Sequence, residues 1–297
     1  MKTLNLASLE SKMLTPLAAV PAPAVPERCF IEVGGGRIAY DRYGDAGAAV
    51  VCVPGLGDTR ATWRALAPLL VAAGYTVYAM DLRGHGDSDA RFEQYAAHDI
   101  ADDVVALMAA EGLRGAALIG NSIGGGAVCR AAALASERVA RLVLINPFVR
   151  DMAADRWLRP LVPVLFARPW GAWAWGKYRA TLFCTEPSDQ AENHAAVVAN
   201  LKEPGRLEAV RAMLRASKAP IAAGLAELTV PSLVLMGARD PDYPNPAAEG
   251  EALRGLLGGP VRVELLDDTG HYPQVERPDE TARLVLSHLK QEENLGA

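Results

Sequence analysis

Residues 115–135 read GAALIGNSIGGGAVCRAAALA, and this stretch indicates the fold more clearly than any other part of the chain. An apolar run typical of a strand ends at Ile119, and an alanine-rich stretch typical of a helix follows Ser122. A serine on such a tight turn needs very small residues two positions on either side, because strand and helix pack closely there. Gly120 and Gly124 meet this requirement. Ser122 is therefore the leading candidate for a nucleophile.

The alternation of strand and helix extends over most of the chain. Apolar runs typical of strands occupy residues 48–53, 75–80, 116–119, 139–145, 232–236 and 261–266, and helical patterns occupy residues 61–73, 96–111, 123–136, 247–257 and 278–290. Before them, residues 29–33 and 37–42 alternate around three glycines and predict a β-hairpin. Continuous apolar strands separated by helices predict an α/β fold, with a parallel sheet covered on both faces.

Two segments depart from this alternation. Residues 148–227 hold four of the five tryptophans, in helical patterns broken by prolines, and predict a helical insertion laid on the sheet. Residues 1–27 form a Pro/Ala-rich arm, for which loose packing or disorder is expected and a cleaved secretory signal is the alternative. The predicted organisation is thus an arm at 1–27, a core at 28–147 and 228–297, and a helical layer at 148–227.

Composition narrows the class of partner. The chain has 297 residues, of which 51% are hydrophobic, and a net charge of -5 without any run of basic residues. This argues against nucleic acid or an anionic membrane as the main partner, and favours a small molecule. Cys52 and Cys129 fall in a predicted strand and helix and are expected to be reduced core thiols, and the expected location is cytoplasmic. No apolar run is long enough to predict a transmembrane helix, and monomer and homodimer both stay open.

A serine nucleophile needs a base within hydrogen-bond reach and an acid that orients the base. His271, in TGHYPQVERP, lies between the last predicted strand and the last helix, at the edge of the sheet where Ser122 is expected. His85 lies on a glycine turn and is predicted to be structural. The acid should also follow a strand at this edge. Asp240, in MGARDPDYP, follows the run at 232–236 closely, and Asp242 is its rival.

Backbone N–H groups should stabilise the negative oxygen that forms during attack by the serine. The N–H of Ile123, directly after the candidate nucleophile, is one expected donor. The second is expected from the glycine turn PGLGD that follows the run at 48–53, where Leu56 is the predicted donor.

With Ser122, Asp240 and His271 in this order, the chain resembles the α/β-hydrolase fold family over residues 28–292. DLRGHGDSD at 81–89 is similar to a loop of that family, GARD to its acid turn, and GHYPQVERP to its histidine loop. The resemblance implies an eight-stranded, mostly parallel sheet, a helical cap, and no cofactor or metal. A serine at the turn also argues against the haloalkane dehalogenase and epoxide hydrolase branches, which use aspartate there.

The resemblance implies a serine hydrolase, and the predicted activity is that of a carboxylesterase acting on small to medium apolar acyl esters. The predicted substrate-binding residues are Asn121, Phe148, Trp170, Trp173 and Trp175. Because GNSxGG is similar to hydrolases that cleave carbon–carbon bonds in ring-fission products, that activity stays an alternative. Thioesterase and lactonase activities are further alternatives, as is a ligand-binding protein without catalysis.

Overall fold

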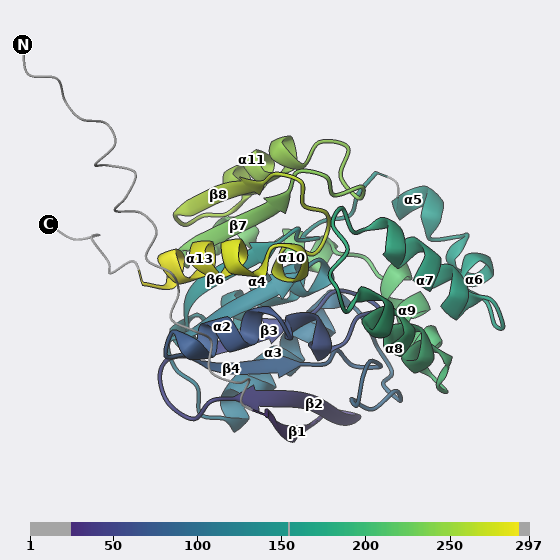
Figure 1. The fold of residues 1–297 in the computed structure, drawn as a ribbon, viewed down its shortest axis with the longest axis horizontal. Helices are drawn as coiled ribbons and strands as arrows, with labels where there is room; N and C mark the ends of the chain where they lie inside the picture. The colour runs from purple at the N-terminus through teal and green to yellow at the C-terminus, as the bar shows by residue number, and fades with distance from the viewer. Residues whose placement is uncertain (1–24, 154, 291–297) are drawn as a thin grey trace, which may run out of the picture.

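The centre of the molecule is an eight-stranded sheet with the strand order β1-β2-β4-β3-β5-β6-β7-β8 (Figure 1). The computed structural model describes residues 25–153 and 155–290, so most of the predicted N-terminal arm lies outside the described residues. The strands are β1 Glu27–Val33, β2 Gly36–Tyr43, β3 Ala49–Val53, β4 Thr76–Met80, β5 Ala116–Asn121, β6 Val139–Ile145, β7 Ser232–Gly237 and β8 Val261–Leu266. β1 and β2 form the predicted hairpin and are antiparallel, and β2 also pairs antiparallel with β4. The six strands β3 to β8 pair in parallel with their neighbours in the sheet. The predicted mostly parallel sheet is confirmed.

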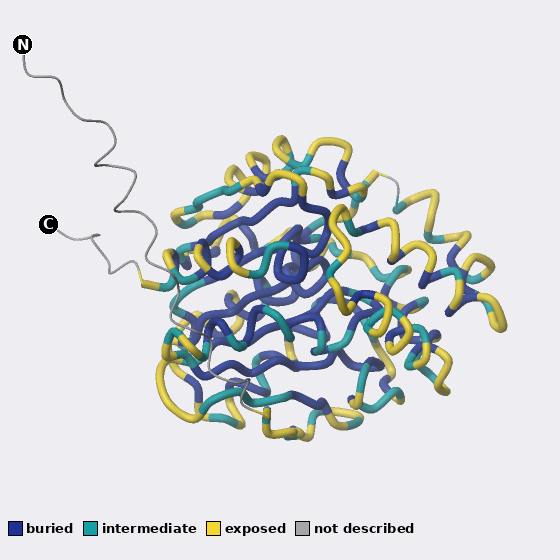
Figure 2. Tube along the Cα trace, in the orientation of Figure 1, coloured by how far each residue is buried: buried dark blue, intermediate teal, exposed yellow. Residues whose placement is uncertain are grey.

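Helices cover both faces of the sheet. They are η1 Arg60–Trp63, α2 Leu66–Ala72, α3 Ala97–Ala110, α4 Ile123–Leu134, η2 Ser136–Arg138, α11 Pro246–Leu256, α12 Pro273–Glu276 and α13 Pro278–Leu289. In β3, Val51 and Val53 belong to the apolar cluster under α3 and α4, while Val50 and Cys52 belong to the cluster under α2 and α13. Strand side chains alternate between the two faces, so a strand buried on both sides must be apolar throughout. The buried centre in Figure 2 follows from this pattern.

A separate group of helices lies between β6 and β7 and beyond one end of the sheet (Figure 1). It consists of α5 Asp155–Leu158, α6 Val162–Leu165, α7 Gly171–Thr181, α8 Gln190–Lys202 and α9 Arg206–Arg215, and we call it the cap. Its small core includes Phe166, Trp175 and Leu207. The chain returns to the sheet through α10 Ala219–Ala222 and η3 Leu225–Glu227, whose Ile221 and Leu225 join the main core. The boundaries 148 and 227 stay a prediction.

The strand order reverses direction at β3, and this reversal opens a crevice. From β3 the chain moves outward to β4, then returns to add β5 on the opposite side of β3. In open α/β sheets, ligands bind at the carboxyl ends of the strands at such a reversal. The glycine turn after β3 and the serine turn after β5 both lie at this point. No helix in the described part of the chain is long and apolar enough to cross a membrane.

Candidate active site

Ser122 lies on a strained turn between β5 and α4. Its φ and ψ angles are 56° and -122°, a conformation that residues other than glycine rarely adopt. The flanking glycines allow the turn to form. A Cβ atom on Gly120 would lie 2.3 Å from the carbonyl oxygen of Gly124, and one on Gly124 would lie 2.4 Å from that of Val53. The close packing expected from the sequence is therefore present, and it fixes the position of the serine backbone.

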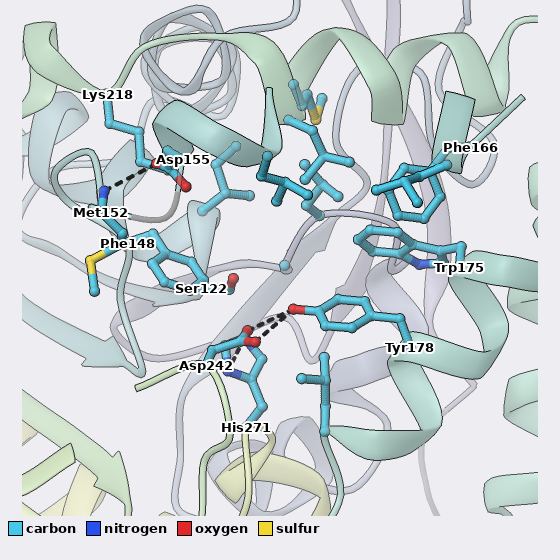
Figure 3. A pocket seen from close by; sticks show the side chains of 18 of the residues that line it. Ser122, Phe148, Met152, Asp155, Phe166, Trp175, Tyr178, Lys218, Asp242 and His271 are labelled. Carbon is cyan, nitrogen blue, oxygen red and sulfur yellow. Dashed lines mark hydrogen bonds and ion pairs between the residues drawn. The ribbon is translucent and has the colours of Figure 1, made fainter. Parts of the chain in front are cut away.

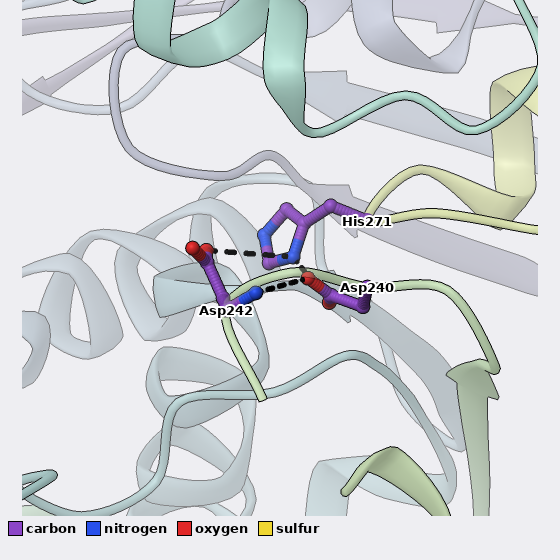
Figure 4. A group of neighbouring side chains, drawn as sticks. All are labelled: Asp240, Asp242 and His271. Atoms are coloured by element: carbon purple, nitrogen blue, oxygen red, sulfur yellow. Dashed lines mark hydrogen bonds and ion pairs between the residues drawn. The ribbon is translucent and has the colours of Figure 1, made fainter. Parts of the chain in front are cut away.

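The histidine and the nearer aspartate meet on two neighbouring loops. Asp240 follows β7 and His271 follows β8, and His271 Nδ1 donates a hydrogen bond of 2.6 Å to Asp240 Oδ2 (Figure 4). This hydrogen bond places the proton on Nδ1, which leaves Nε2 as the acceptor nitrogen of a neutral ring. Asp242 Oδ2 lies 3.8 Å from the same Nδ1. The carboxylate of Asp242 instead accepts from the hydroxyl group of Tyr178 in the cap, at 2.7 Å on Oδ1 and 2.9 Å on Oδ2. Of the two rival acids, Asp240 makes the direct contact.

Three carboxylates change the pKa of His271. Complete burial alone would lower this pKa, but Asp240, Asp242 and Asp58 favour the charged ring and raise it to about 9. Burial raises the pKa of Asp242, and Tyr178 and His271 act in the opposite direction. Within the described ranges, ligand atoms of Asp240, Asp242 and His271 also come within 4.8 Å of one another, a spacing that could hold a metal ion. The hydrogen bonds to His271 and Tyr178 already use these carboxylates, however.

Ser122 and His271 open into a cavity of about 490 Å³ beneath the cap (Figure 3). Its walls are mainly apolar and include Phe148 and Trp175, two of the residues predicted to bind substrate. The remaining lining residues are Gly55, Leu56, Ile123, Met152, Asp155, Leu158, Leu165, Phe166, Ala174, Tyr178, Leu182, Met213, Leu214, Lys218, Asp242 and Tyr272.

The other three residues predicted to bind substrate, Asn121, Trp170 and Trp173, do not line this cavity. Trp170, directly before α7, and Trp173, in its first turn, are both largely exposed, whereas Trp175 is buried and lines the cavity. Asn121 is fully buried behind the site. Its Nδ2 donates hydrogen bonds to the carbonyl oxygens of Ile145 and His271, so it holds the histidine loop rather than a ligand.

Asn146 has a similar supporting role that the sequence did not reveal. Its side chain donates to the carbonyl oxygen of Gly270 and accepts from the N–H of Gly237. These contacts join the loop that carries His271 to the end of the strand that precedes Asp240. An asparagine after a strand gave no sign of this, because both partners lie more than 90 residues away along the chain.

The predicted oxyanion donors also face the cavity. Leu56 and Ile123 line it, and in the described part of the chain neither backbone N–H donates a hydrogen bond to another residue. The next residue, Gly57, has a φ of 76° and donates its N–H to Nε2 of His85 at 3.0 Å. Burial lowers the pKa of His85 to about 4, which keeps the ring neutral and able to accept. His85 therefore supports the turn, as its position on a glycine turn suggested.

Helix α7 of the cap rests directly on this turn. A Cβ atom on Gly57 would come within 2.3 Å of the Trp175 ring. Arg179 and Asp58, each with a side chain only 1% exposed, form an ion pair of 2.7 Å. The hydroxyl group of Tyr272, next to His271, donates to the other oxygen of Asp58 at 2.7 Å. Removing one member of a buried pair costs about 3–5 kcal/mol. This cluster therefore fixes the cap, the oxyanion turn and the histidine loop relative to one another.

Comparison with known families agrees with the observed fold. The alpha/beta hydrolase fold family matches residues 48–278, which is more than three quarters of the chain. The chain belongs to this family. The matching α/β-hydrolase region contains Ser122, Asp240 and His271, and it spans the cap as well as most of the sheet.

Individual relatives of this α/β-hydrolase differ in their activities. It is 25% identical over 327 residues to epoxide hydrolase A of Mycobacterium tuberculosis, a match that covers 89% of this chain and 97% of that protein. It is 28% identical to a dihydrolipoyllysine-residue acetyltransferase component of an acetoin cleaving system from Cupriavidus necator, covering 88% of this chain and 68% of that protein. An esterase from Rhodococcus sp. superposes with a TM-score of 0.73 at 26% identity, covering 90% of this chain and 98% of the other. Two of these three relatives are hydrolases by name, an epoxide hydrolase and an esterase, and the third is an acetyltransferase component.

Proposed function

We propose that this α/β-hydrolase is a serine hydrolase, and specifically a carboxylesterase acting on small to medium apolar acyl esters. The observation that carries the proposal is the opening of Ser122 and of the Asp240-bound His271 into one mainly apolar cavity. A strained serine, an oriented imidazole and a buried carboxylate are the three groups that acyl transfer to a serine requires.

In the proposed mechanism, Ser122 Oγ attacks the ester carbonyl while His271 Nε2 accepts its proton. Asp240 holds the ring in the required tautomer and stabilises the imidazolium that forms. The N–H groups of Leu56 and Ile123 stabilise the oxyanion. His271 then donates the proton to the leaving alcohol, which departs and leaves an acyl group on Ser122. A water molecule, activated by His271, releases the acid and restores the serine.

The cavity supports the proposed class of substrate. Its volume of about 490 Å³ lies within the range of small-molecule sites, and its walls are largely apolar. Phe166 and Trp175 pack edge to face on one side of Ser122, where they would contact an apolar chain (Figure 3). The similarity to the Rhodococcus esterase is a further support. The cytoplasmic location remains part of the proposal.

A panel of substrates tests this function. We expect turnover of p-nitrophenyl butanoate and hexanoate to exceed that of the matching thioester, of a lactone and of a vinylogous diketone. A higher kcat/KM on the diketone would replace the proposal with carbon–carbon bond hydrolysis, and a preference for thioester or lactone would replace it with those activities. No turnover of any member, together with no fluorophosphonate adduct on Ser122, would indicate a ligand-binding protein.

The pH dependence follows from the pKa of His271. Because the free enzyme must lose a proton from His271 before this ring can accept one, kcat/KM for a neutral ester should rise with pH until an inflection near 9. Asp242→Asn removes one of the carboxylates that raise this pKa and should move the inflection to lower pH. The exposed Asp45→Asn is the matched control and should leave it in place. An inflection near 6 in the unaltered enzyme would contradict this expectation.

A further inference from the structure

One side of the cavity carries an ion pair that the proposed mechanism does not use. Lys218, at the start of α10, and Asp155, at the start of α5, both line the cavity, and Lys218 Nζ donates to Asp155 Oδ2 at 2.8 Å. The side chains are 14% and 18% exposed. An ion pair in a mainly apolar wall is costly to desolvate, so it calls for a functional explanation.

The pair is held in place but is not saturated. The backbone N–H of Lys218 donates to Asp151, and its ammonium group lies 5.7 Å from the centre of the Phe148 ring. Asp155 Oδ2 also accepts from the N–H of Met152. Within residues 25–153 and 155–290, however, Asp155 Oδ1 accepts no hydrogen bond, and Lys218 Nζ uses only one of its three N–H groups. One acceptor and two donors therefore remain for a ligand.

The charge around the pair is balanced. Arg159 contacts both Asp151 and Asp155, whereas Lys218 contacts Asp155 through its ammonium group and Asp151 through its backbone N–H. Two cations and two anions give this cluster no formal net charge. A carboxylate in the ligand would be attracted by Lys218 but repelled by Asp155, whereas a hydroxyl group can accept from the ammonium and donate to the carboxylate at once.

The position of the pair defines which part of the substrate it would meet. Figure 3 shows Lys218 and Asp155 on one side of Ser122, and Phe166 and Trp175 on the other. A substrate bound across Ser122 therefore meets an aromatic wall with one end and a charged pair with the other. Phe148, which lies under the ammonium of Lys218, is also 6.0 Å from the His271 ring, so the pair belongs to the same cavity as the candidate catalytic groups.

We propose that Lys218 and Asp155 form a subsite for an uncharged hydroxyl group of the substrate, so that the preferred esters are apolar at one end and hydroxylated at the other. The turnover test of this subsite rests on the proposed ester hydrolysis, whereas the binding test does not. A site that hydrogen-bonds a substrate hydroxyl strongly disfavours the analogue that lacks it, because its own polar groups then lose a partner.

The turnover assay uses two series of esters. The first varies the acyl group and compares p-nitrophenyl alkanoates with p-nitrophenyl ω-hydroxyalkanoates, from butanoyl to octanoyl. The second varies the alcohol and compares butyl butanoate with ω-hydroxybutyl butanoate. In at least one of these series, kcat/KM should favour the hydroxylated member by about tenfold, the value expected for one hydrogen bond to a charged group. Lys218→Met and Asp155→Asn should each reduce this ratio towards one. Lys177→Met alters an exposed lysine beside Trp173, outside the cavity, and should keep the ratio.

The binding assay uses the intact esters with Ser122→Ala and follows intrinsic tryptophan fluorescence, to which Trp175 in the cavity wall contributes. In this assay, a hydroxyl preference that depends on Lys218 would support the subsite even if no ester were hydrolysed. Failure of the subsite and failure of the proposed function can therefore be distinguished. The subsite would be overturned by equal affinity for the paired esters, or by a preference that survives Lys218→Met. The p-nitrophenyl monoester of adipic acid carries a carboxylate where p-nitrophenyl 6-hydroxyhexanoate carries a hydroxyl group. Tighter binding of the adipate ester would also overturn the hydroxyl subsite, in favour of an anion site. Lys218→Leu, which also removes every side-chain donor, replaces Lys218→Met if the latter does not fold.

Discussion

Replacing Ser122 with alanine is expected to abolish ester hydrolysis, with kcat falling about a million-fold, as happens when a serine nucleophile is removed from an intact site. The alanine keeps the same strained backbone, since Gly120 and Gly124 and not the hydroxyl group shape the turn. The free energy of unfolding should therefore change by no more than about 0.5 kcal/mol. Turnover of p-nitrophenyl butanoate and urea unfolding measure the two effects.

A second serine provides the control for this result. Ser287 is exposed on α13 and does not line the cavity, so Ser287→Ala should retain full turnover. Mass spectrometry after fluorophosphonate treatment should place the adduct on Ser122 in the unaltered protein and in Ser287→Ala, but not in Ser122→Ala. Substantial turnover by Ser122→Ala, or an adduct on another residue, would show that Ser122 is not the nucleophile.

Asp240→Asn is expected to lower kcat about ten-thousand-fold, close to the loss seen when the acid of a serine triad is replaced by its amide. The amide can offer its NH₂ group to Nδ1 of His271, which would leave the proton on Nε2, where a proton acceptor is needed. Because His271 Nδ1 and Asp240 Oδ2 are in direct contact at 2.6 Å, replacing this carboxylate by an amide acts on the imidazole tautomer without an intervening residue. The measurement is kcat for p-nitrophenyl butanoate at pH values on both sides of 9.

Asp242→Asn is the matched comparison, because it makes the same chemical change two residues away. Asp242 lies 3.8 Å from His271 Nδ1 and accepts its hydrogen bonds from Tyr178, so its loss leaves the tautomer unchanged. We expect a decrease in kcat of less than about tenfold, the size of a weak charge interaction. A greater loss from Asp242→Asn than from Asp240→Asn would reverse the assignment of the acid.

The sequence predicted the features that depend on neighbouring residues. The apolar runs gave each strand to within about two residues, because a strand buried on both faces has no polar alternation to obscure it. Gly120 and Gly124 identified the serine turn for a steric reason that the close backbone contacts bear out. The predicted contact between His271 and an acid after β7 also depended only on where parallel strands end.

The sequence did not predict the features that depend on the direction of a side chain. Trp170, Trp173 and Trp175 follow one another closely along the chain, yet successive positions on α7 face different sides and only Trp175 lines the cavity. Asn121 points away from the cavity, as alternation along a strand allows for the residue before Ser122. The pairing of Asp58 with Arg179 joins residues 121 positions apart, and no local pattern could predict it.

The buried pair between Arg179 and Asp58 limits how this enzyme could be re-engineered. Exchanging residues 148–227 for the corresponding segment of another hydrolase would remove Arg179 and Trp175 together. Asp58 would then keep a buried charge with only Tyr272 beside it, and Gly57 would lose the ring that covers it. The smallest transplantable unit is therefore the helical segment together with the loop that carries Gly57 and Asp58, and chimaeras that divide these two pieces should be recovered mainly as insoluble protein.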